Sequence, residues 1–426
     1  MNICLMTNTY LPHVGGVARS VSTFAEEYRR LGHEVLVVAP DFPGRKLPRR
    51  QEAIVERIAA LQQFNGSDFS VRLPLAAALS ERLDNFRADI FHAHHPFLLG
   101  DTALRLAARR NVPVVFTHHT RYEDYTHYVP FDSPALKQAA IHLSTDFANL
   151  CDGVIAPSAS IARLLQRRGV HAPIRVIPTG IAVEAFASGN GARARERLGI
   201  PRRAFVIGHV GRLATEKNLS YLAEAVAPLV AATPGSRFLV VGAGPAEDDL
   251  VARFERAGAA SRLVRAGLLT GRPLHDAYRA MDVFAFSSLS ETQGMVVTEA
   301  MAASVPVVAL RGSGVREVVR HDQNGYLLPA GTRPAVFATH LARLRADPRL
   351  RRRFAGAARA TADSLSRRHC AEQALGFYEH VRALTRRERL VTDRSPWGTL
   401  LRRVGVEWEI VARNARTVAD ALASAS

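Results

Sequence analysis

The stretch from residue 283 to residue 303 constrains the fold more than any other part of the sequence. It begins with an apolar run, VFAF at 283–286, which is typical of a buried parallel strand. A polar loop follows at 287–294, and a helix is predicted at about 295–303. Ligands of open α/β sheets bind beyond the carboxyl ends of the strands. We therefore expect a ligand site in this loop.

Two glutamates bracket the loop and the start of the helix. Glu291 and Glu299 have seven residues between them. The backbone N–H groups of Gly294, Met295 and Val296 would lie at a helix N-terminus, where the helix dipole favours an anion. Two carboxylates beside an anion site suit a ligand with both hydroxyls and phosphates, which describes a sugar nucleotide. The alternative is a solvated loop acid and a second acid that complements the helix dipole.

Strands and helices are predicted to alternate along both halves of the chain. The strands of the N-terminal half are expected at 2–7, 33–40, 89–96, 112–116, 153–157 and 174–178. Those of the C-terminal half are expected at 204–211, 237–242, 263–268, 283–286, 306–310 and 326–329. This alternation predicts an α/β fold with parallel sheets.

The length of the chain fits two domains. We expect an N-terminal domain at 1–182 and a C-terminal domain at 192–370, joined by a polar, glycine-rich linker. A basic tail at 371–426 carries both tryptophans, Trp397 and Trp408. We expect this tail to pack back on the N-terminal domain, with membrane contact as the alternative.

Glycines follow the first predicted strand of the N-terminal half and the second predicted strand of the C-terminal half. Gly15 and Gly16 precede the first helix, where glycine lets the backbone approach a ligand closely, although tight turns use such pairs routinely. Gly242 and Gly244 begin a dinucleotide-binding motif, but Glu247 occupies the place of its third glycine. This departure argues against an oxidoreductase.

Two neighbouring strand ends of the N-terminal half carry histidines. The residues are His92, His94, His95, His118 and His119. They are plausible metal ligands by type, but no cysteine and no H-E-x-x-H motif supports a metal site. Polar contact with substrate hydroxyls is the interpretation that we favour.

Two cations follow the first strand of the C-terminal half. Arg212 and Lys217 lie in a strand–helix junction, where the guanidinium fork and the ammonium point charge suit a diphosphate. A solvated basic loop is the alternative. Lys217 is one of three lysines in the chain, with Lys46 and Lys137. The absence of a D-x-D motif gives no indication of a metal that would hold the diphosphate.

The composition is strongly basic, with a formal net charge of +17. Such an excess indicates anionic partners, which include nucleic acid, anionic lipid and phosphorylated substrates, or it serves solubility. No nucleic-acid-binding motif occurs, so we expect no nucleic-acid partner. The basic loop at 44–50, ahead of a helix predicted at 51–61, is either solvated or in contact with an anionic surface.

The cysteines and the apolar runs constrain the compartment. Cys4, Cys151 and Cys370 are scattered and predict no disulfide framework, which fits a reducing cytoplasm. The N-terminus has no signal-peptide pattern, and no apolar run is long enough to span a bilayer. We expect a cytoplasmic protein that lies peripherally on the inner face of the membrane, and a monomer.

The motif Glu-x7-Glu, continued by EAMA and PVV, resembles that of the retaining, family 4-like glycosyltransferases of the GT-B fold. The resemblance covers nearly the whole chain. The resemblance implies two Rossmann-like domains that face each other across a cleft, with the donor mainly on the C-terminal domain. It implies that Glu299 accepts hydrogen bonds from ribose hydroxyls and that Glu291 accepts them from sugar hydroxyls. Arg212 and Lys217, with the amides at 294–296, would bind the diphosphate and neutralise it as it leaves.

The resemblance also assigns residues of the N-terminal half. The loop of Gly15 and Gly16 would close over the donor phosphates, and His119 would contact the donor sugar. Thr120 stands where many members carry aspartate, so a role of that aspartate does not transfer. His119, Arg212, Lys217 and Glu291 are thus the candidate catalytic residues, and no cofactor or metal is expected.

The stretch THHTRYEDYTHYVP at 117–130 resembles the subgroup that transfers a sugar to diacylglycerol. In that subgroup this stretch borders the acceptor site, which implies Tyr122, Tyr125 and His127 as acceptor residues. The alternative is an ordered surface loop whose tyrosines pack on the rim. The run ETQG at 291–294 points to the same subgroup.

The sequence thus predicts a metal-independent, retaining hexosyltransferase that uses a sugar nucleotide, for which UDP-glucose is expected, and a lipid acceptor such as diacylglycerol. The leaving phosphate of such enzymes is thought to deprotonate the acceptor, so no side-chain nucleophile is assigned. Transfer from a UDP- or GDP-sugar to a phosphatidylinositol-type, soluble or polysaccharide acceptor is the main alternative. A sugar-nucleotide epimerase and a nucleic-acid binder are the remaining ones.

Overall fold

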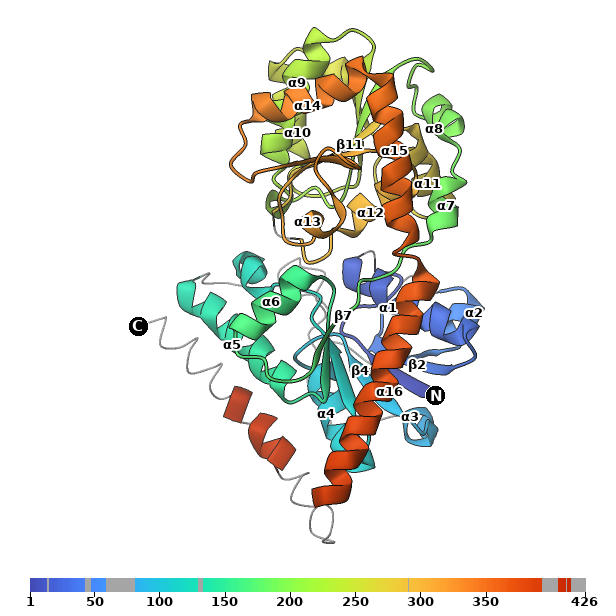
Figure 1. Cartoon of the computed structure of the whole chain (residues 1–426), viewed down its shortest axis with the longest axis vertical. Coiled ribbons are helices and arrows are strands. Elements are labelled where there is room, and N and C mark those ends of the chain that lie inside the picture. Colours follow the sequence, from blue (N-terminus) through green and yellow to red (C-terminus); the bar gives the residue numbers. More distant parts are fainter. Residues whose placement is uncertain are drawn as a thin grey trace. The chain divides into compact units, whose positions relative to one another are not determined.

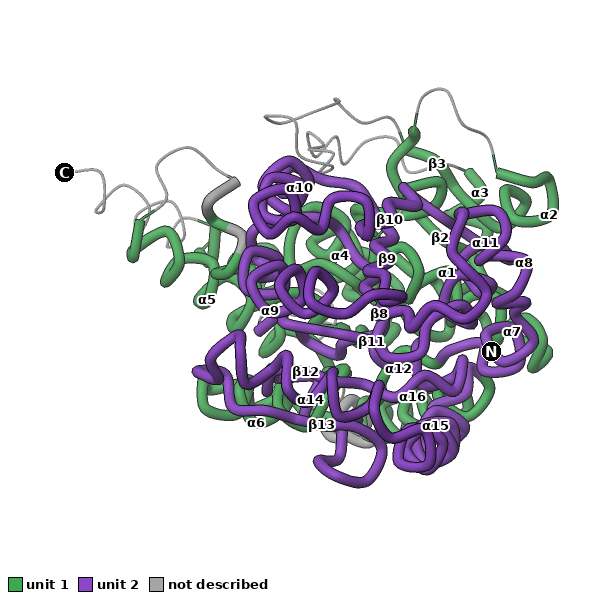
Figure 2. Tube along the Cα trace, turned by 90° about the horizontal axis from the view of Figure 1, so that it is seen from above, with its two compact units in different colours: residues 1–180, 368–426 green, residues 181–367 purple. Residues whose placement is uncertain are grey.

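The chain divides into two compact units, which Figure 2 distinguishes by colour. Unit 1 comprises Met1–Gly180 and Arg368–Ser426, and unit 2 comprises Ile181–Arg367. The structure is a computed structural model that describes residues 1–13, 15–42, 47–58, 81–128, 133–289, 291–392, 405–410 and 412–414.

Unit 1 is built on a seven-stranded sheet in which each pair of neighbouring strands is parallel. The strand order is β3 (Val55–Ile58), β2 (Glu34–Pro40), β1 (Asn2–Met6), β4 (Ile90–Ala93), β5 (Val114–Thr117), β6 (Gly153–Ala156) and β7 (Ile174–Val176). The order reverses between β1 and β4, which makes that point the topological switch of a doubly wound sheet.

Helices cover both faces of this sheet because successive residues of each strand point to opposite sides. Ile3 and Leu5 of β1 pack in one apolar cluster, and Cys4 and Met6 pack in another. The helical segments of unit 1 (Figure 1) are α1 (Gly16–Arg30), α2 (Arg49–Glu52), α3 (Glu81–Asn85), α4 (Leu99–Arg110), η1 (Tyr122–Tyr128), α5 (Pro134–Asn149), α6 (Ala159–Arg167) and α16 (Arg367–Thr392).

The long helix α16 belongs to the core of unit 1, although it lies far along the sequence. Its apolar residues Phe377, Tyr378 and Val381 are buried in the same cluster as Tyr28 of α1. The hydroxyls of Tyr28 and Tyr378 are hydrogen-bonded at 2.8 Å. Figure 1 shows α16 running along the sheet of unit 1.

A short helical segment near the C-terminus also packs on unit 1. Ile410 is buried in the cluster that contains Phe147 of α5. Arg413 is buried, forms an ion pair with Asp101 of α4, and lies 5.5 Å from the ring centroid of Phe147. Trp408 is 72% exposed, and the other tryptophan of the tail lies outside the described residues.

Unit 2 has a six-stranded sheet, again with parallel neighbours. Its strand order is β10 (Leu263–Arg265), β9 (Ser236–Val241), β8 (Phe205–Val210), β11 (Val283–Phe286), β12 (Val307–Leu310) and β13 (Gly325–Leu328). In chain order this is 3-2-1-4-5-6, the order of the Rossmann fold. The predicted α/β fold with two Rossmann-like domains is therefore confirmed.

The helical segments of unit 2 cover both faces of its sheet (Figure 1). They are α7 (Val183–Ala187), α8 (Gly191–Arg197), η2 (Thr215–Lys217), α9 (Leu219–Ala232), α10 (Glu247–Arg256), η3 (Ala260–Arg262), α11 (Gly271–Ala280), α12 (Met295–Ala302), α13 (Val315–Val318), α14 (Pro334–Ala346) and α15 (Pro348–Asp363).

One local prediction was wrong. The helix expected at 51–61 ends at Glu52 as α2, and Val55–Ile58 forms strand β3 at the edge of the sheet, with Val55 opposite Val37. Apolar residues at positions 54, 55 and 58 fit one face of a helix and a short strand equally well. Pairing with β2 decides between the two, and that contact is not visible in the local sequence.

Candidate functional site

The carboxyl ends of β8 and β11, at the topological switch of unit 2, bring Lys217 and Glu291 together. Lys217 ends η2, which follows β8, and Glu291 lies in the loop after β11. Lys217 Nζ lies 2.5 Å from Glu291 Oε1, and each side chain is only 17% exposed. Two residues that the sequence places 74 positions apart thus form a partly buried ion pair.

Polar contacts fix the two loops that carry this pair. Ser287 Oγ donates to the carbonyl oxygens of Lys217 at 3.1 Å and Asn218 at 2.9 Å. Ser288 Oγ donates to the carbonyl oxygen of Glu216 at 3.3 Å, and Asn218 Nδ2 donates to the carbonyl oxygen of Ser287 at 3.3 Å. The loops are therefore held before any ligand binds, which reduces the ordering that binding requires.

The carboxylate of Glu291 stays ionised. Burial acts to raise its pKa, but the charge and the hydrogen bond of the Lys217 ammonium, with a hydrogen bond from Ser288, lower the pKa below its ordinary value overall. An ionised carboxylate only accepts hydrogen bonds. Glu291 is therefore suited to the hydroxyls of a ligand, and Lys217 is suited to its phosphate.

The N-terminus of α12 lies directly after the Glu291 loop. Gly294 is its N-cap and adopts a left-handed conformation, with φ of 71°, which glycine adopts without strain. Met295 and Val296 lie in the first turn of α12. The backbone N–H groups of a first turn have no carbonyl acceptor within their own helix. These amides follow the loop of Glu291 directly in the chain, and their binding of an anion stays a prediction.

Glu299 lies one turn further into α12 and is buried, with 2% exposure. The hydroxyl of Tyr278, from α11, donates to Glu299 Oε2 at 2.8 Å and lies 3.3 Å from the carbonyl oxygen of Val296. Tyr278 thus fixes the orientation of the Glu299 carboxylate. Sequence reasoning missed it, because a tyrosine inside a predicted helix gives no sign of its partner on another helix.

Arg212 follows β8 and is more open than Lys217. Its side chain is 42% exposed, and its Nη2 lies 3.5 Å from Glu216 Oε1. The Glu216 side chain is only 8% exposed, so the pair is open on the arginine side alone. The guanidinium is therefore accessible to a ligand.

The glycines at 242 and 244 have a structural role. Gly242 has φ of 143°, and a Cβ atom there would lie 1.9 Å from the carbonyl oxygen of Gly211. Leu213 donates its N–H to the carbonyl oxygen of Ala243 at 3.0 Å. The glycine-rich loop thus packs directly against the loop after β8, which carries Arg212.

His209 of β8 is a further polar residue near Lys217 and Glu291, and its position inside an apolar strand gives no sign of this in the sequence. Its ring stacks on Phe284 and Phe286 of β11, and its Nδ1 donates to the carbonyl oxygen of Ala285 at 3.2 Å. Within the described part of the chain, its Nε2 has no hydrogen-bond partner. Burial lowers the pKa of His209 to about 4, so the ring is neutral at neutral pH.

In unit 1, Gly15 is the N-cap of α1, and Gly16 is its first residue. A Cβ atom at Gly15 would lie 2.8 Å from His13 Nε2, whereas one at Gly16 would meet open space. Of the two glycines, only Gly15 would need a neighbour, the ring of His13, to shift for a Cβ atom to fit.

The predicted histidines meet at the carboxyl ends of β4 and β5. His94 Nδ1 and His119 Nε2 are 2.8 Å apart. His92 has structural partners on both nitrogens, with Thr117 at 2.7 Å and Tyr378 at 2.6 Å. His95 Nδ1 accepts from the backbone N–H of Asn8 at 3.1 Å, although no sequence signal predicts this contact.

His92, His94, His95 and His118 are buried, and His119 is partly buried. Desolvation lowers the pKa values of all five histidines, for His92 and His95 to about 3. They are therefore neutral hydrogen-bonding groups at neutral pH. Over the described ranges, no group of three or more His, Cys, Asp or Glu side chains could hold a metal ion.

The predicted acceptor residues lie in η1. The ring of Tyr122 lies 5.7 Å from that of Phe97 and 6.0 Å from that of His118. Tyr125 and His127 share this helical segment, but their side chains lie outside the described residues.

Two family models match the chain. The one described as Glycosyltransferase Family 4 matches residues 14–185, and the one described as Glycosyl transferases group 1 matches residues 204–347.

Curated relatives cover most of the chain. The Alpha-monoglucosyldiacylglycerol synthase of Acholeplasma laidlawii is 28% identical over 82% of this chain and 89% of its own. Its namesake in Streptococcus pneumoniae is 30% identical over 72% and 71%. The GDP-mannose-dependent alpha-mannosyltransferase of Mycobacterium tuberculosis is 30% identical over 90% and 97%.

Solved structures show the same fold. Anabaena Alr3699/HepE in complex with UDP-glucose has a TM-score of 0.70 at 22% identity, over 88% of this chain and 99% of that one. WaaG, a glycosyltransferase of lipopolysaccharide biosynthesis, has a TM-score of 0.69 at 16% identity, over 88% and 99%.

No helix in the part that the structure describes is long and apolar enough to cross a membrane.

Proposed function

The chain belongs to glycosyltransferase family 4, in the diacylglycerol glucosyltransferase-like subgroup of GT-B enzymes, and we propose that it transfers a hexose, with retention of configuration and without a metal, from UDP-glucose to a lipid acceptor such as diacylglycerol. The site of unit 2 binds the donor. The transfer takes place at the cytoplasmic face of the membrane, to which the basic charge of +17 attracts the protein.

The ion pair of Lys217 and Glu291 carries this proposal. A sugar nucleotide presents phosphate oxygens and sugar hydroxyls side by side, and it therefore offers a replacement partner to each member of the pair. On donor binding, Lys217 turns from the carboxylate to the diphosphate, and Glu291 accepts hydrogen bonds from the sugar. The amides of Gly294 to Val296 add fixed dipoles beside the phosphates.

The same groups act on the chemical step. Negative charge grows on the diphosphate as the bond to the sugar breaks, and preorganised cations and amides stabilise that charge more than they stabilise the bound donor. Lys217, Arg212 and the α12 amides supply this stabilisation. The leaving phosphate takes the proton of the acceptor hydroxyl on the same face of the sugar, so that no side-chain nucleophile takes part.

Glu299 and Tyr278 bind the nucleoside part. The Glu299 carboxylate accepts hydrogen bonds from the ribose hydroxyls, and the Tyr278 hydroxyl holds the carboxylate in place from α11. GDP-mannose is the second candidate donor, because the mycobacterial relative, named for that donor, aligns over nearly its whole length.

Transfer assays test the proposal. The purified protein is incubated with a panel of UDP-, GDP- and ADP-sugars, with and without vesicles that contain diacylglycerol. Transfer from UDP-glucose to diacylglycerol is the expected result. If only GDP-mannose supports transfer, GDP-mannose replaces UDP-glucose as the proposed donor. If the donor is consumed at the same rate with and without the lipid vesicles, a lipid acceptor is ruled out.

Sedimentation with vesicles separates a membrane enzyme from one with a soluble acceptor. We expect the protein to sediment with anionic vesicles at low salt and to be released as salt screens its basic surface. An enzyme for soluble or polysaccharide acceptors would stay in the supernatant under both conditions.

A further inference from the structure

A cluster of polar groups in unit 1 is buried without complete hydrogen bonding. Its members are His118, after β5, Tyr122 and Glu123, in η1, and Arg168, at the end of α6. Counting only partners among the described residues, both ring nitrogens of His118, the hydroxyl of Tyr122, Oε2 of Glu123 and Nη1 of Arg168 have none. We propose that these four side chains form the subsite that receives the neutral glycerol moiety of the acceptor.

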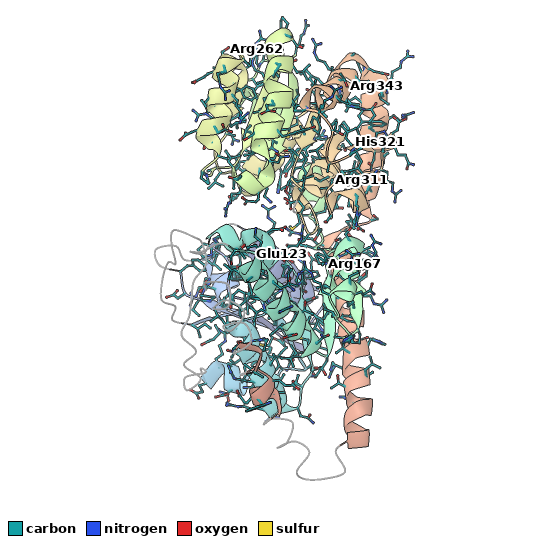
Figure 3. All side chains as sticks on the ribbon, turned by 90° about the vertical axis from the view of Figure 1, so that its left-hand side faces the viewer. Glu123, Arg167, Arg262, Arg311, His321 and Arg343 are labelled. Atoms are coloured by element: carbon teal, nitrogen blue, oxygen red, sulfur yellow. The ribbon has the colours of Figure 1, made fainter. Side chains whose placement is uncertain are left out.

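The four side chains form two pairs, which the neighbouring residues Tyr122 and Glu123 join along the chain. Arg168 Nη2 donates to Glu123 Oε1 at 2.6 Å, and Arg121 Nε donates to the same oxygen at 3.2 Å. Both arginines therefore use Oε1 and leave Oε2 of the carboxylate available. The rings of His118 and Tyr122 meet edge to face, with centroids 6.0 Å apart. Figure 3 labels Glu123 within unit 1.

The location fits a substrate site. His118 follows β5 directly, at the carboxyl edge of the parallel sheet where ligands of such folds bind. It also precedes His119, which the family resemblance assigns to the donor sugar and which is hydrogen-bonded to His94. The cluster therefore adjoins a residue that is expected at the reaction centre.

Burial makes the missing partners significant. A buried polar group without a hydrogen bond costs about 1–3 kcal/mol, and the large majority of such groups in folded proteins are satisfied by protein or ordered water. Several such atoms in one place indicate that something outside the protein completes them. The two possibilities are a ligand and a set of internal waters.

The charges of the cluster define the ligand. Arg121 and Arg168 supply two positive charges, and Glu123 and Asp124 supply two negative charges, so the formal sum is zero. Burial lowers the pKa of His118 to about 4, which leaves its ring neutral at neutral pH. A neutral group can bind while both ion pairs stay intact, whereas a phosphorylated headgroup would have to draw an arginine away from its carboxylate.

The free atoms also match a glycerol ester. Arg168 Nη1 and the Tyr122 hydroxyl donate hydrogen bonds, which suits the carbonyl oxygens of acyl esters. Glu123 Oε2 and one nitrogen of the neutral His118 ring accept hydrogen bonds, which suits a free hydroxyl. Diacylglycerol carries both kinds of group and no charge. This inference rests on the proposed function, because it assumes transfer to a lipid.

Tyr122→Phe tests the subsite with little risk to folding. The substitution removes only a hydroxyl that has no partner among the described side chains, so we expect no loss of thermal stability. The KM for diacylglycerol should rise about 3- to 10-fold, as for the loss of one hydrogen bond to a neutral group, while the KM for the sugar nucleotide stays constant. Tyr326→Phe is the matched control, because it removes another buried hydroxyl without a described partner, in unit 2.

Glu123→Gln tests the charge argument. The substitution gives the cluster a net positive charge. The ratio of kcat/KM for diacylglycerol to kcat/KM for phosphatidylglycerol should therefore fall about tenfold. Both lipids are presented at low mole fraction in neutral detergent micelles, so that the surface charge stays constant. Circular dichroism of the variant confirms that it folds.

The outcomes separate the two proposals. Transfer to diacylglycerol by the wild type, with a raised acceptor KM in Tyr122→Phe, supports the subsite. Transfer with an unchanged acceptor KM in Tyr122→Phe overturns the subsite alone and identifies the cluster as internal water sites only. If the wild type uses phosphatidylglycerol as well as diacylglycerol, the proposal that the subsite selects a neutral ligand is wrong. Transfer to no lipid from any donor overturns the proposed function and the subsite together.

Discussion

The two units share the strand order 3-2-1-4-5-6, to which unit 1 adds β7, but they differ in the polar groups at their carboxyl edges. Unit 2 pairs its charges, as in Lys217 with Glu291, and anchors Glu299 with Tyr278. Unit 1 buries neutral histidines whose pKa values are lowered, and it leaves atoms of His118 and Tyr122 without described partners. The donor site that we propose in unit 2 thus centres on one ion pair, whereas the acceptor subsite that we propose in unit 1 combines neutral rings with ion pairs.

The acid stability of the two units should differ most. The folded-state pKa values of His92, His95 and His118 are about 3, 3 and 4, against about 6.5 in an unfolded chain. The unfolded state therefore binds protons that folded unit 1 does not. The stabilisation that these neutral histidines contribute is fully present above about pH 6.5 and is lost as the pH falls toward 4 and 3. The free energy of unfolding decreases by about 1.4 kcal/mol for each unit of pKa difference.

Unit 2 has one comparable residue, His209, whose pKa is about 4. We expect peptides of unit 1 to lose hydrogen-exchange protection at a higher pH than peptides of unit 2 on acidification from pH 7. If peptides of both units lose protection at the same pH, the two units do not differ in acid stability.

Lys217→Ala should have the largest effect on catalysis. Removal of the ammonium takes away a positive charge at the leaving diphosphate, and we expect kcat to fall about 10²- to 10³-fold, more than KM rises. Steady-state kinetics with the sugar nucleotide measures both constants. Lys137→Ala, at an exposed lysine of unit 1, is the control. A change in KM alone would mean that Lys217 binds only the ground state.

Glu299→Ala should weaken donor binding. The carboxylate accepts charge-assisted hydrogen bonds from the ribose in our proposal, so its loss should raise the Kd for the nucleoside diphosphate about 10- to 100-fold. Isothermal titration calorimetry measures that Kd. Glu224→Ala, which removes an exposed partner of Arg253, should leave it unchanged. Full affinity in Glu299→Ala would contradict the assigned role.

Tyr278→Phe should give the smallest effect of the series. It removes the hydroxyl that orients Glu299 but keeps the ring in the apolar core. We expect a Kd increase of about 2- to 10-fold for the same ligand, with no additional loss when Glu299 is already Ala. Additive losses in the double variant would show that Tyr278 acts independently of the carboxylate.

Much of the fold follows from local sequence patterns. The apolar run at 283–286 and the polar loop after it predicted a strand and the loop that carries Glu291, and both are present. The strand β3 was missed because its apolar spacing fits two structures and only β2 decides between them. Local periodicity thus identified the central strands better than the edge strand.

The candidate site divides in a similar way. Loops after strands were recognisable, and so were the residue types in them, such as Lys217 and Glu291. Their 2.5 Å contact was not, because it joins loops separated by a whole set of strands and helices. Tyr278, His209 and Arg168 lie inside ordinary helical or strand patterns, and their importance depends on partners that only the tertiary structure brings close.

The discontinuity of unit 1 has a consequence for biosynthesis. Unit 2 is a continuous segment that ends at Arg367, whereas the core of unit 1 requires Phe377, Tyr378 and Val381 of α16. On the ribosome, the residues of unit 2 therefore emerge in full while the sheet of unit 1 still lacks the helix that covers one face. The unit whose translation begins first is therefore the last to be completed, and one apolar face of its sheet stays uncovered until α16 has been made.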